Sequence, residues 1–267
     1  MMKRDPITLY RVMKHFEESL DYFKKNQIVG IFLQGSQNYG LELPNSDVDT
    51  KLIVVPSFED IALNHKPVST THIRANEEHI DFKDIRLYME TFRKQNLNFL
   101  EILFTPYSIV NDPYMKDWLK LVEAREQIAR MNPYRAVKSM KGVAMEKWHA
   151  MEHEYPSKVE VLAKFGYDPK QLHHLLRVED YLERYINGES YESCLRPSDP
   201  GYLMDIKIGV LGLDEARRVG QRSIDHVIEM ADKYCEGREN KEDEEMRALL
   251  EEVQVSIMKK AIINELK

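Results

Sequence analysis

The chain has 267 residues, of which 43% are hydrophobic and 31% are charged, a balance that excludes the disordered and fibrous classes. This length allows one large domain or two modest ones. The formal net charge of −7 argues against a broad electrostatic surface for a nucleic-acid backbone, although a small basic patch for an RNA end remains compatible with it.

The first part of the chain predicts a helix followed by two strands. Residues 8–25 place apolar side chains at helical spacing with charges on the other face, and either Asp5 or Thr8 can cap this helix. Residues 28–33 and 48–55 are short apolar runs, as expected of strands that are buried on both faces. Together they indicate the start of a packed sheet.

The next segments complete a mixed α/β domain. Residues 56–77 are polar and irregular and predict a loop or a short helix. Residues 78–85 alternate between apolar and polar side chains, with Asp81 on the polar face, and predict a third strand. Asp84 is typical of a helix N-cap. Residues 98–106 predict either a fourth strand or a buried turn of helix.

After about residue 113 all the predicted elements are helices. They cover residues 115–130, 134–154, 169–188, 213–235 and 242–263. We therefore expect an α/β (α+β) protein with a catalytic domain over residues 1–112, in which helices flank a mixed sheet. An all-helical domain over residues 113–267 would form the other wall of a cleft.

One candidate site lies in the stretch "GSQNYGLELPNSDVDTKLIVV". Gly35 and Ser36 follow the first strand, where glycine permits close approach of an anion and backbone N–H groups with the serine hydroxyl favour a phosphate. After a loop of ten residues (37 to 46), Asp47 and Asp49 are spaced to share one strand face. Two such carboxylates repel each other unless a divalent cation with a preference for oxygen ligands lies between them.

Taken singly, these residues have simpler explanations. Gly35 and Ser36 can form an ordinary strand-to-helix turn, and Asp47 can belong to an Asn-Ser-Asp turn. Asp49 favours the metal site, because it falls inside the predicted strand, where a partnerless carboxylate that faces the core is costly.

Further side chains extend the site. Two-metal chemistry requires a third carboxylate, for which we choose Asp81 over its rival Asp84. Lys51 continues the face of the aspartate pair, and it either reaches a phosphate or serves as an ion-pair partner. These residue types together indicate metal-assisted phosphoryl or nucleotidyl transfer.

The order of Gly-Ser, spacer and Asp-x-Asp before an apolar strand resembles the signature of the DNA polymerase β-like nucleotidyltransferase superfamily. The resemblance implies that Gly35 and Ser36 hold the nucleoside triphosphate. It also implies that Asp47 and Asp49 bind two Mg²⁺ ions, for which Mn²⁺ can substitute, and that Asp81 completes the metal site.

A narrower resemblance covers residues 28–215 and includes "NFLEILFTP" and "YDPKQLHHLLR". These segments look like a predicted-nucleotidyltransferase family, some of whose members lie beside RNA ligases. The resemblance suggests Lys170, His174 and Arg177 as ligands of the triphosphate or the acceptor. By spacing alone, His173 or His174 can share a helix face with Arg177, and a histidine among leucines is usually part of a core.

We therefore expect a Mg²⁺-dependent transferase that moves a nucleoside monophosphate from an NTP to a hydroxyl or phosphate acceptor. An RNA end, a protein hydroxyl and a small molecule are all compatible acceptors. Two alternatives are a nucleotide-binding regulatory protein without transferase activity and a metal-dependent phosphohydrolase.

Two further features of the sequence bear on the cellular compartment of the protein. Cys194 and Cys235 are far apart, so we expect no disulfide framework. The segment "MMKRDPITLY" lacks an apolar signal-type core, and no run approaches the ~20 apolar residues of a membrane span. We expect a cytoplasmic protein without a membrane partner.

Overall fold

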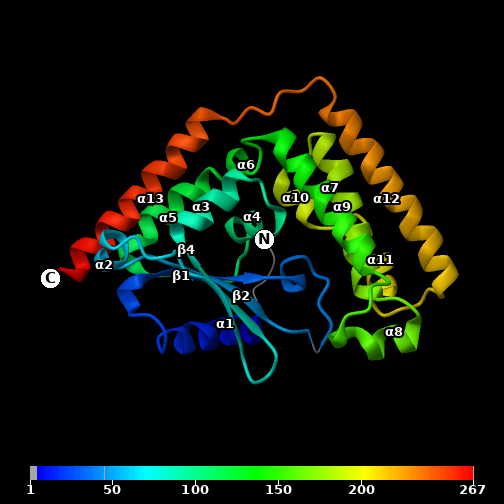
Figure 1. The fold of residues 1–267 in the computed structure, drawn as a ribbon, viewed down its shortest axis with the longest axis horizontal. Coiled ribbons are helices and arrows are strands. Elements are labelled where there is room, and N and C mark those ends of the chain that lie inside the picture. The colour runs from blue at the N-terminus through cyan, green and yellow to red at the C-terminus, as the bar shows by residue number, and fades with distance from the viewer. Residues whose placement is uncertain (1–4, 45, 267) are drawn as a thin grey trace. The chain divides into compact units, whose positions relative to one another are not determined.

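The computed structural model describes residues 5–44 and 46–266 (Figure 1). They form two compact units. The first comprises Met1–Asn38, Glu42–Met131 and Glu242–Lys267, and the second comprises Tyr39–Leu41 and Asn132–Lys241. Among the residues described, no helix has the length and apolar character needed to cross a membrane.

The first unit is built on a five-stranded mixed sheet with the order β3-β4-β2-β1-β5. Strands β2 and β4 are parallel, and the other neighbouring pairs are antiparallel. The strand bounds are β1 Ile28–Gln34, β2 Asp49–Val54, β3 Ser69–Ile73, β4 His79–Asp84 and β5 Ser108–Val110. With helices on both faces of the sheet, the predicted α/β class with a mixed sheet is confirmed (Figure 1).

Helix α1 (Pro6–Ser19) covers one face of this sheet. Of the two predicted N-cap residues, Asp5 caps this helix: its Oδ2 accepts a hydrogen bond from the Thr8 N–H at 2.8 Å. Val12 of α1 is fully buried and packs into an apolar cluster with residues of β1, β2 and β4. This burial fixes which faces of β2 and β4 turn inward.

The opposite face carries helices α3 (Ile85–Arg93) and α4 (Leu97–Leu100). Asp84 caps α3, as predicted, through the Arg86 N–H at 2.9 Å. Residues 98–106 contain the end of α4 and a short 3-10 turn, Glu101–Leu103, so the helical alternative is confirmed. Two strands, β3 and β5, were not predicted.

Four further helices of the described residues belong to the first unit, namely α2 (Phe58–Ala62), which is the short helix predicted as one alternative for residues 56–77, α5 (Asp112–Glu123), α6 (Arg125–Ile128) and α13 (Glu244–Glu265). Trp118 of α5 packs on Phe32 of β1, with ring centroids 4.3 Å apart. Lys260 of α13 pairs with Asp117 of α5 at 2.6 Å. The structure therefore groups with the sheet three helices that the division after residue 112 places in the helical domain.

The second unit is helical, as its periodicity predicts. Its helices are α7 (Pro133–Ala150), α8 (Val159–Phe165), α9 (Pro169–Ile186), α10 (Tyr191–Leu195), α11 (Pro200–Lys207) and α12 (Leu213–Cys235). Helix α9 packs against α7, α10, α11 and α12. A Cβ at Gly220 of α12 would lie 2.4 Å from the Trp148 ring of α7, so glycine permits their close approach.

Candidate active site

The Gly-Ser turn follows the end of β1. Gly35 has a φ of +112°, a conformation that favours glycine over residues with a Cβ. Ser36 begins a 3-10 turn of three residues, Ser36–Asn38, so no longer helix follows the strand. The contribution of a helix dipole to phosphate binding is therefore limited to one turn, so a phosphate here would depend mainly on local N–H groups and the Ser36 hydroxyl.

Gln37 connects this turn to the aspartate pair, a contact that the sequence did not reveal. Its side-chain Nε2 donates to the backbone carbonyl of Asp47 at 2.7 Å, and the side chain is buried. In the antiparallel register of β1 and β2, Gln34 lies opposite Asp49. The predicted phosphate turn and the predicted metal ligands are thus neighbours in space.

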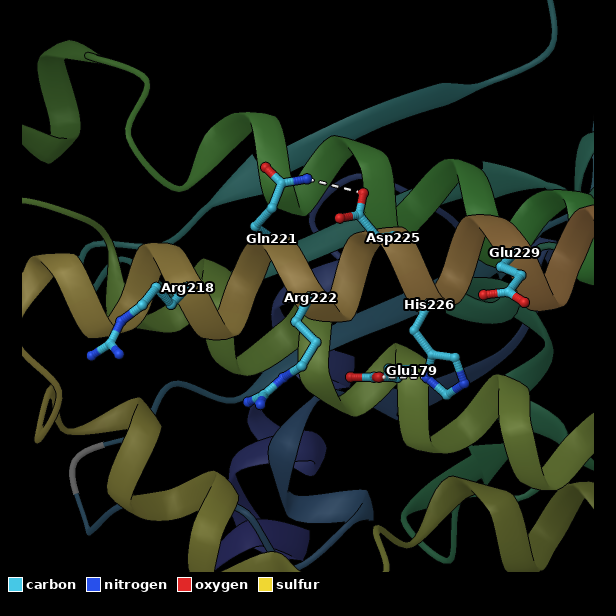
Figure 2. A pocket seen from close by; sticks show the side chains of 7 residues that line it. All are labelled: Glu179, Arg218, Gln221, Arg222, Asp225, His226 and Glu229. Atoms are coloured by element: carbon cyan, nitrogen blue, oxygen red, sulfur yellow. Dashed lines mark hydrogen bonds and ion pairs between the residues drawn. The ribbon is translucent and has the colours of Figure 1, made fainter.

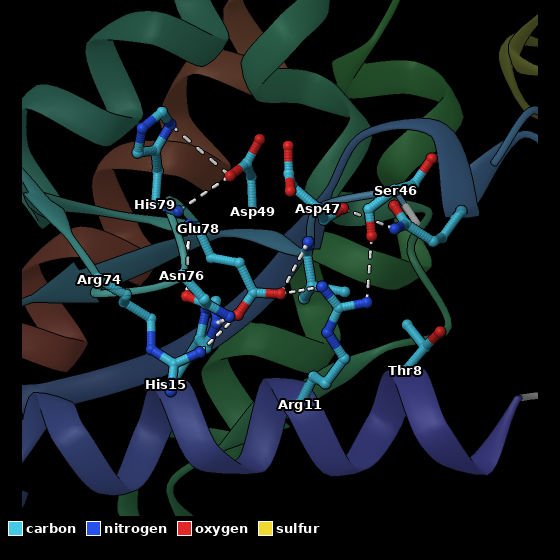
Figure 3. Close-up of polar contacts among 12 residues, drawn as sticks. Thr8, Arg11, His15, Ser46, Asp47, Asp49, Arg74, Asn76, Glu78 and His79 are labelled. Atoms are coloured by element: carbon cyan, nitrogen blue, oxygen red, sulfur yellow. Dashed lines mark hydrogen bonds and ion pairs between the residues drawn. The ribbon is translucent and has the colours of Figure 1, made fainter. Parts of the chain in front are cut away.

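Asp47 and Asp49 point their carboxylates to the same side, away from α1 (Figure 3). Within the residues described, the Asp47 carboxylate is exposed and has no hydrogen bond or ion pair. Asp49 is the first residue of β2, and its side chain is 42% exposed. It accepts a hydrogen bond from the His79 N–H at 3.0 Å. The expectation that Asp49 is partnerless and faces the core is therefore wrong.

Lys51 and Asp81 face each other on neighbouring strands. They are direct partners in the parallel register of β2 and β4, and their Nζ and Oδ2 atoms are 3.3 Å apart. Thr71 donates to the other Asp81 oxygen at 2.6 Å. Lys51 is only 2% exposed, and its ammonium lies 4.2 Å from the centre of the Phe99 ring. Of the two roles predicted for Lys51, the structure contains the ion pair.

The electrostatics of Lys51 reflect this burial. Loss of solvent lowers the pKa of the Lys51 ammonium below its usual value, and the nearby Asp81 carboxylate opposes the effect. Asp81 itself remains 37% exposed at its side chain. It can therefore be reached from solvent despite its two partners.

The donor chemistry of the pair fits a Mg²⁺ ion. This ion prefers hard oxygen ligands and is commonly held by one or two carboxylates together with substrate phosphates. Asp47 and Asp49 supply such ligands on one open side. In the described part of the chain, no three His, Cys, Asp or Glu side chains form a metal-binding group. Asp81 as the third metal ligand therefore stays a prediction.

The rival carboxylate, Asp84, lies elsewhere. It is buried on the face of β4 opposite to Asp81, and both of its oxygens accept hydrogen bonds from Arg86. A carboxylate that caps a helix and pairs with a guanidinium in this way is accounted for structurally. We conclude that Asp84 is not part of the candidate site.

A buried acidic residue next to the aspartates was not recognised from the sequence. Glu78 is 1% exposed, and its carboxylate contacts Arg11, His15, Arg74 and the Val48 N–H (Figure 3). Burial would raise the pKa of Glu78, but the hydrogen bonds from His15 and its other partners outweigh it and lower the pKa to about 2. Glu78 is therefore ionised at neutral pH.

The helical-unit candidates lie on α9. Lys170 is exposed, His174 is half-buried, and Arg177 is buried with its guanidinium 4.2 Å from the centre of the Tyr39 ring. Burial, aided by the positive charge of Arg177, lowers the pKa of His174 well below its usual range. His173 is a core residue that hydrogen-bonds the Leu203 carbonyl at 2.8 Å. The roles of Lys170, His174 and Arg177 as ligands stay predictions.

Comparisons with known proteins add only distant likeness among solved structures. No protein-family model and no curated protein matches the chain. Among solved structures, a nucleotidyltransferase-like protein from Exiguobacterium sibiricum is similar, with a TM-score of 0.30 and 10% sequence identity over 84% of this chain and 77% of that chain. A likeness this distant identifies no family and assigns no activity.

Proposed function

We propose that the chain is a Mg²⁺-dependent nucleotidyltransferase, which moves a nucleoside monophosphate from an NTP to a hydroxyl or phosphate acceptor. The observation that supports this proposal is the open pair of Asp47 and Asp49 carboxylates beside the Gly35–Ser36 turn, with Gln37 joining the two. The sequence resemblance described above points to the same reaction class.

In the proposed reaction, an acceptor oxygen attacks the α-phosphorus, and a new P–O bond forms. The bond from the α-phosphorus to the oxygen shared with the β-phosphate breaks, and pyrophosphate leaves with the electron pair. Mg²⁺ held by Asp47 and Asp49 would neutralise charge on the phosphates. Ser36 and the N–H groups of the turn would donate hydrogen bonds to the triphosphate.

Asp81 would accept the proton when the acceptor is a hydroxyl. It lies on the same sheet face as Asp49 because it pairs with Lys51, two residues further along β2. Each of its oxygens receives one hydrogen bond, from Thr71 and from Lys51, which leaves a further lone pair on each. Its partial exposure gives an acceptor access to those lone pairs.

A second candidate function is nucleotide binding without transfer. The engagement of Asp81 by both Lys51 and Thr71 favours it, because these two donors compete with an acceptor hydroxyl for the carboxylate oxygens. Binding of an NTP without transfer to any acceptor would support this candidate.

The test uses each of the four NTPs, labelled at the α-phosphate, with Mg²⁺ and with RNA, protein and small-molecule acceptors. We expect the label on an acceptor. The rate of transfer should fall by at least about 100-fold in Asp47→Asn and Asp49→Asn, because the bound metal stabilises the charge of the transition state by several kcal/mol. Asp21→Asn, at an exposed aspartate in the turn after α1, is the matched control. Undiminished transfer in Asp47→Asn or Asp49→Asn would overturn the proposal. Release of nucleoside monophosphate or inorganic phosphate in the absence of an acceptor would instead indicate a phosphohydrolase.

A further inference from the structure

The segment that carries the aspartate pair is held at every second residue. Arg11 donates to the Ser46 carbonyl at 3.1 Å, Glu78 accepts from the Val48 N–H at 3.1 Å, and His15 contacts the Thr50 hydroxyl at 2.9 Å. The two residues between these anchor points are Asp47 and Asp49. Their carboxylates point away from α1, on which Arg11 and His15 lie (Figure 3).

Two of these three side chains, Arg11 and His15, also contact the third, the Glu78 carboxylate. Glu78 accepts hydrogen bonds from Arg11 through Oε1 and from His15 through Oε2, the latter at 2.9 Å. Since an ionised carboxylate only accepts, the His15 Nε2 carries the proton in this pair. Burial lowers the pKa of His15, so the ring is neutral near pH 7, and its Nδ1 accepts from the Thr50 hydroxyl. Every contact in this chain of hydrogen bonds therefore has a consistent donor and acceptor.

The position of Glu78 in the fold explains why it can organise the segment. It immediately precedes β4, whose parallel pairing with β2 brings it beside the start of β2. A buried carboxylate is stable only when it is paired and hydrogen-bonded, and the guanidinium groups of Arg11 and Arg74 supply that compensation. Removing the carboxylate would leave the Val48 N–H and both arginines without this partner.

We propose that Glu78 is a positioning residue, which holds the segment of residues 46–50 so that Asp47 and Asp49 present their carboxylates together to a divalent cation. This inference rests on the proposed function for the identity of the metal ligands. Glu78 itself has no role in the proposed reaction. Outer partners of metal ligands typically change metal affinity by about 10- to 100-fold when they are removed.

The experiment measures Mn²⁺ binding to the full chain by electron paramagnetic resonance, without nucleotide. The site is defined as the binding that Asp47→Asn removes. We expect Glu78→Ala to raise the dissociation constant of this site by about 10- to 100-fold. Glu78→Gln retains an oxygen for the Val48 N–H, so its dissociation constant should fall between those of the wild type and Glu78→Ala.

Glu18→Gln is the matched control. Glu18 also pairs with Arg74, at 2.5 Å, but contacts none of residues 46–50, so its substitution should leave Mn²⁺ binding unchanged. Circular dichroism identifies the variants that remain folded. If Glu78→Ala does not fold, Arg11→Gln replaces it, because Arg11 is partly exposed and contacts Ser46 directly.

The outcomes separate the two proposals. Wild-type affinity in folded Glu78 variants, or in Arg11→Gln, overturns the positioning role and leaves the proposed function in place. Equal binding by the wild type and Asp47→Asn overturns both proposals. A Glu18→Gln effect as large as that of Glu78→Ala also overturns the positioning role, because it would trace the effect to Arg74 rather than to the contact with Val48.

Discussion

The backbone N–H of Val48 donates to the Glu78 carboxylate at 3.1 Å, between two aspartates that face the other way. This contact joins the start of β2 to the residue before β4. The same carboxylate also contacts Arg11 and His15 of α1, so the contact links three segments of the first unit. Its strength depends on the charge of Glu78, which makes it sensitive to pH.

Acidification should destabilise the protein through Glu78. Its pKa is lowered from 4.5 to about 2, so its contribution is complete above pH 4.5 and is lost as the pH falls towards 2. A shift of this size corresponds to roughly 3 kcal/mol. The lowered pKa of His15 acts in the same direction, because the unfolded chain takes up that proton first as the pH falls below 6.5.

Urea unfolding between pH 7 and pH 3 measures this dependence. The free energy of unfolding should fall less steeply with pH in Glu78→Gln than in the wild type, while Asp21→Asn should follow the wild type. Parallel curves for Glu78→Gln and the wild type would contradict the assignment of the pH dependence to Glu78.

The sequence predicts best the elements whose structure depends on local pattern. Residues 213–235 were predicted as a helix and form α12, because an amphipathic period over many turns outweighs local exceptions. Asp84 was predicted as an N-cap, which depends only on its immediate neighbours. The strand β3 was missed because "STTHI" is an exposed edge strand without an apolar alternation.

The contacts of the candidate site were harder to predict because they join distant segments. Nothing in the sequence near Glu78 indicates that it is buried, since its partners Arg11 and His15 lie on α1. Asp49 was placed inside a strand, whereas β2 begins at this residue and leaves it half-exposed. The end of a strand is predicted from pattern alone only to within a few residues. For Asp49, a difference of this size determines whether the carboxylate is predicted to be buried or exposed.

Gly35→Ala should destabilise the protein by about 1 kcal/mol or more, because a Cβ disfavours its φ of +112°. Space is not the obstacle, since a Cβ there would have Gln37 Oε1 as its nearest neighbour, at 3.6 Å. Gly142→Ala is the matched control in α7, where a Cβ meets no atom within 4 Å and should stabilise by roughly 0.5–1 kcal/mol. Chemical unfolding of both variants tests this, and equal effects would contradict a conformational requirement at Gly35.

Lys51→Met should change ATP affinity by less than about threefold, because the ammonium is already paired with Asp81 and covered by Phe99. The unfolding free energy should change by no more than about 1 kcal/mol, since Asp81 is accessible to water and methionine fills the buried volume. Isothermal calorimetry with ATP measures the first effect. Lys83→Met, near the same ring at 4.9 Å, is the control. A tenfold or larger loss of ATP affinity in Lys51→Met alone would instead assign Lys51 to the phosphates.

Asp81→Asn and Asp84→Ala should separate catalysis from stability. In the proposed reaction Asp81 accepts a proton, so Asp81→Asn should lower kcat by about 100-fold or more while the dissociation constant for ATP changes little. Asp84→Ala should retain kcat but lose about 1–3 kcal/mol of stability, because it removes the cap of α3 and the partner of Arg86. Steady-state kinetics with a hydroxyl acceptor, calorimetry and urea unfolding measure the three quantities. A large loss of kcat in folded Asp84→Ala, with Asp81→Asn unaffected, would reverse the assignment of the third carboxylate.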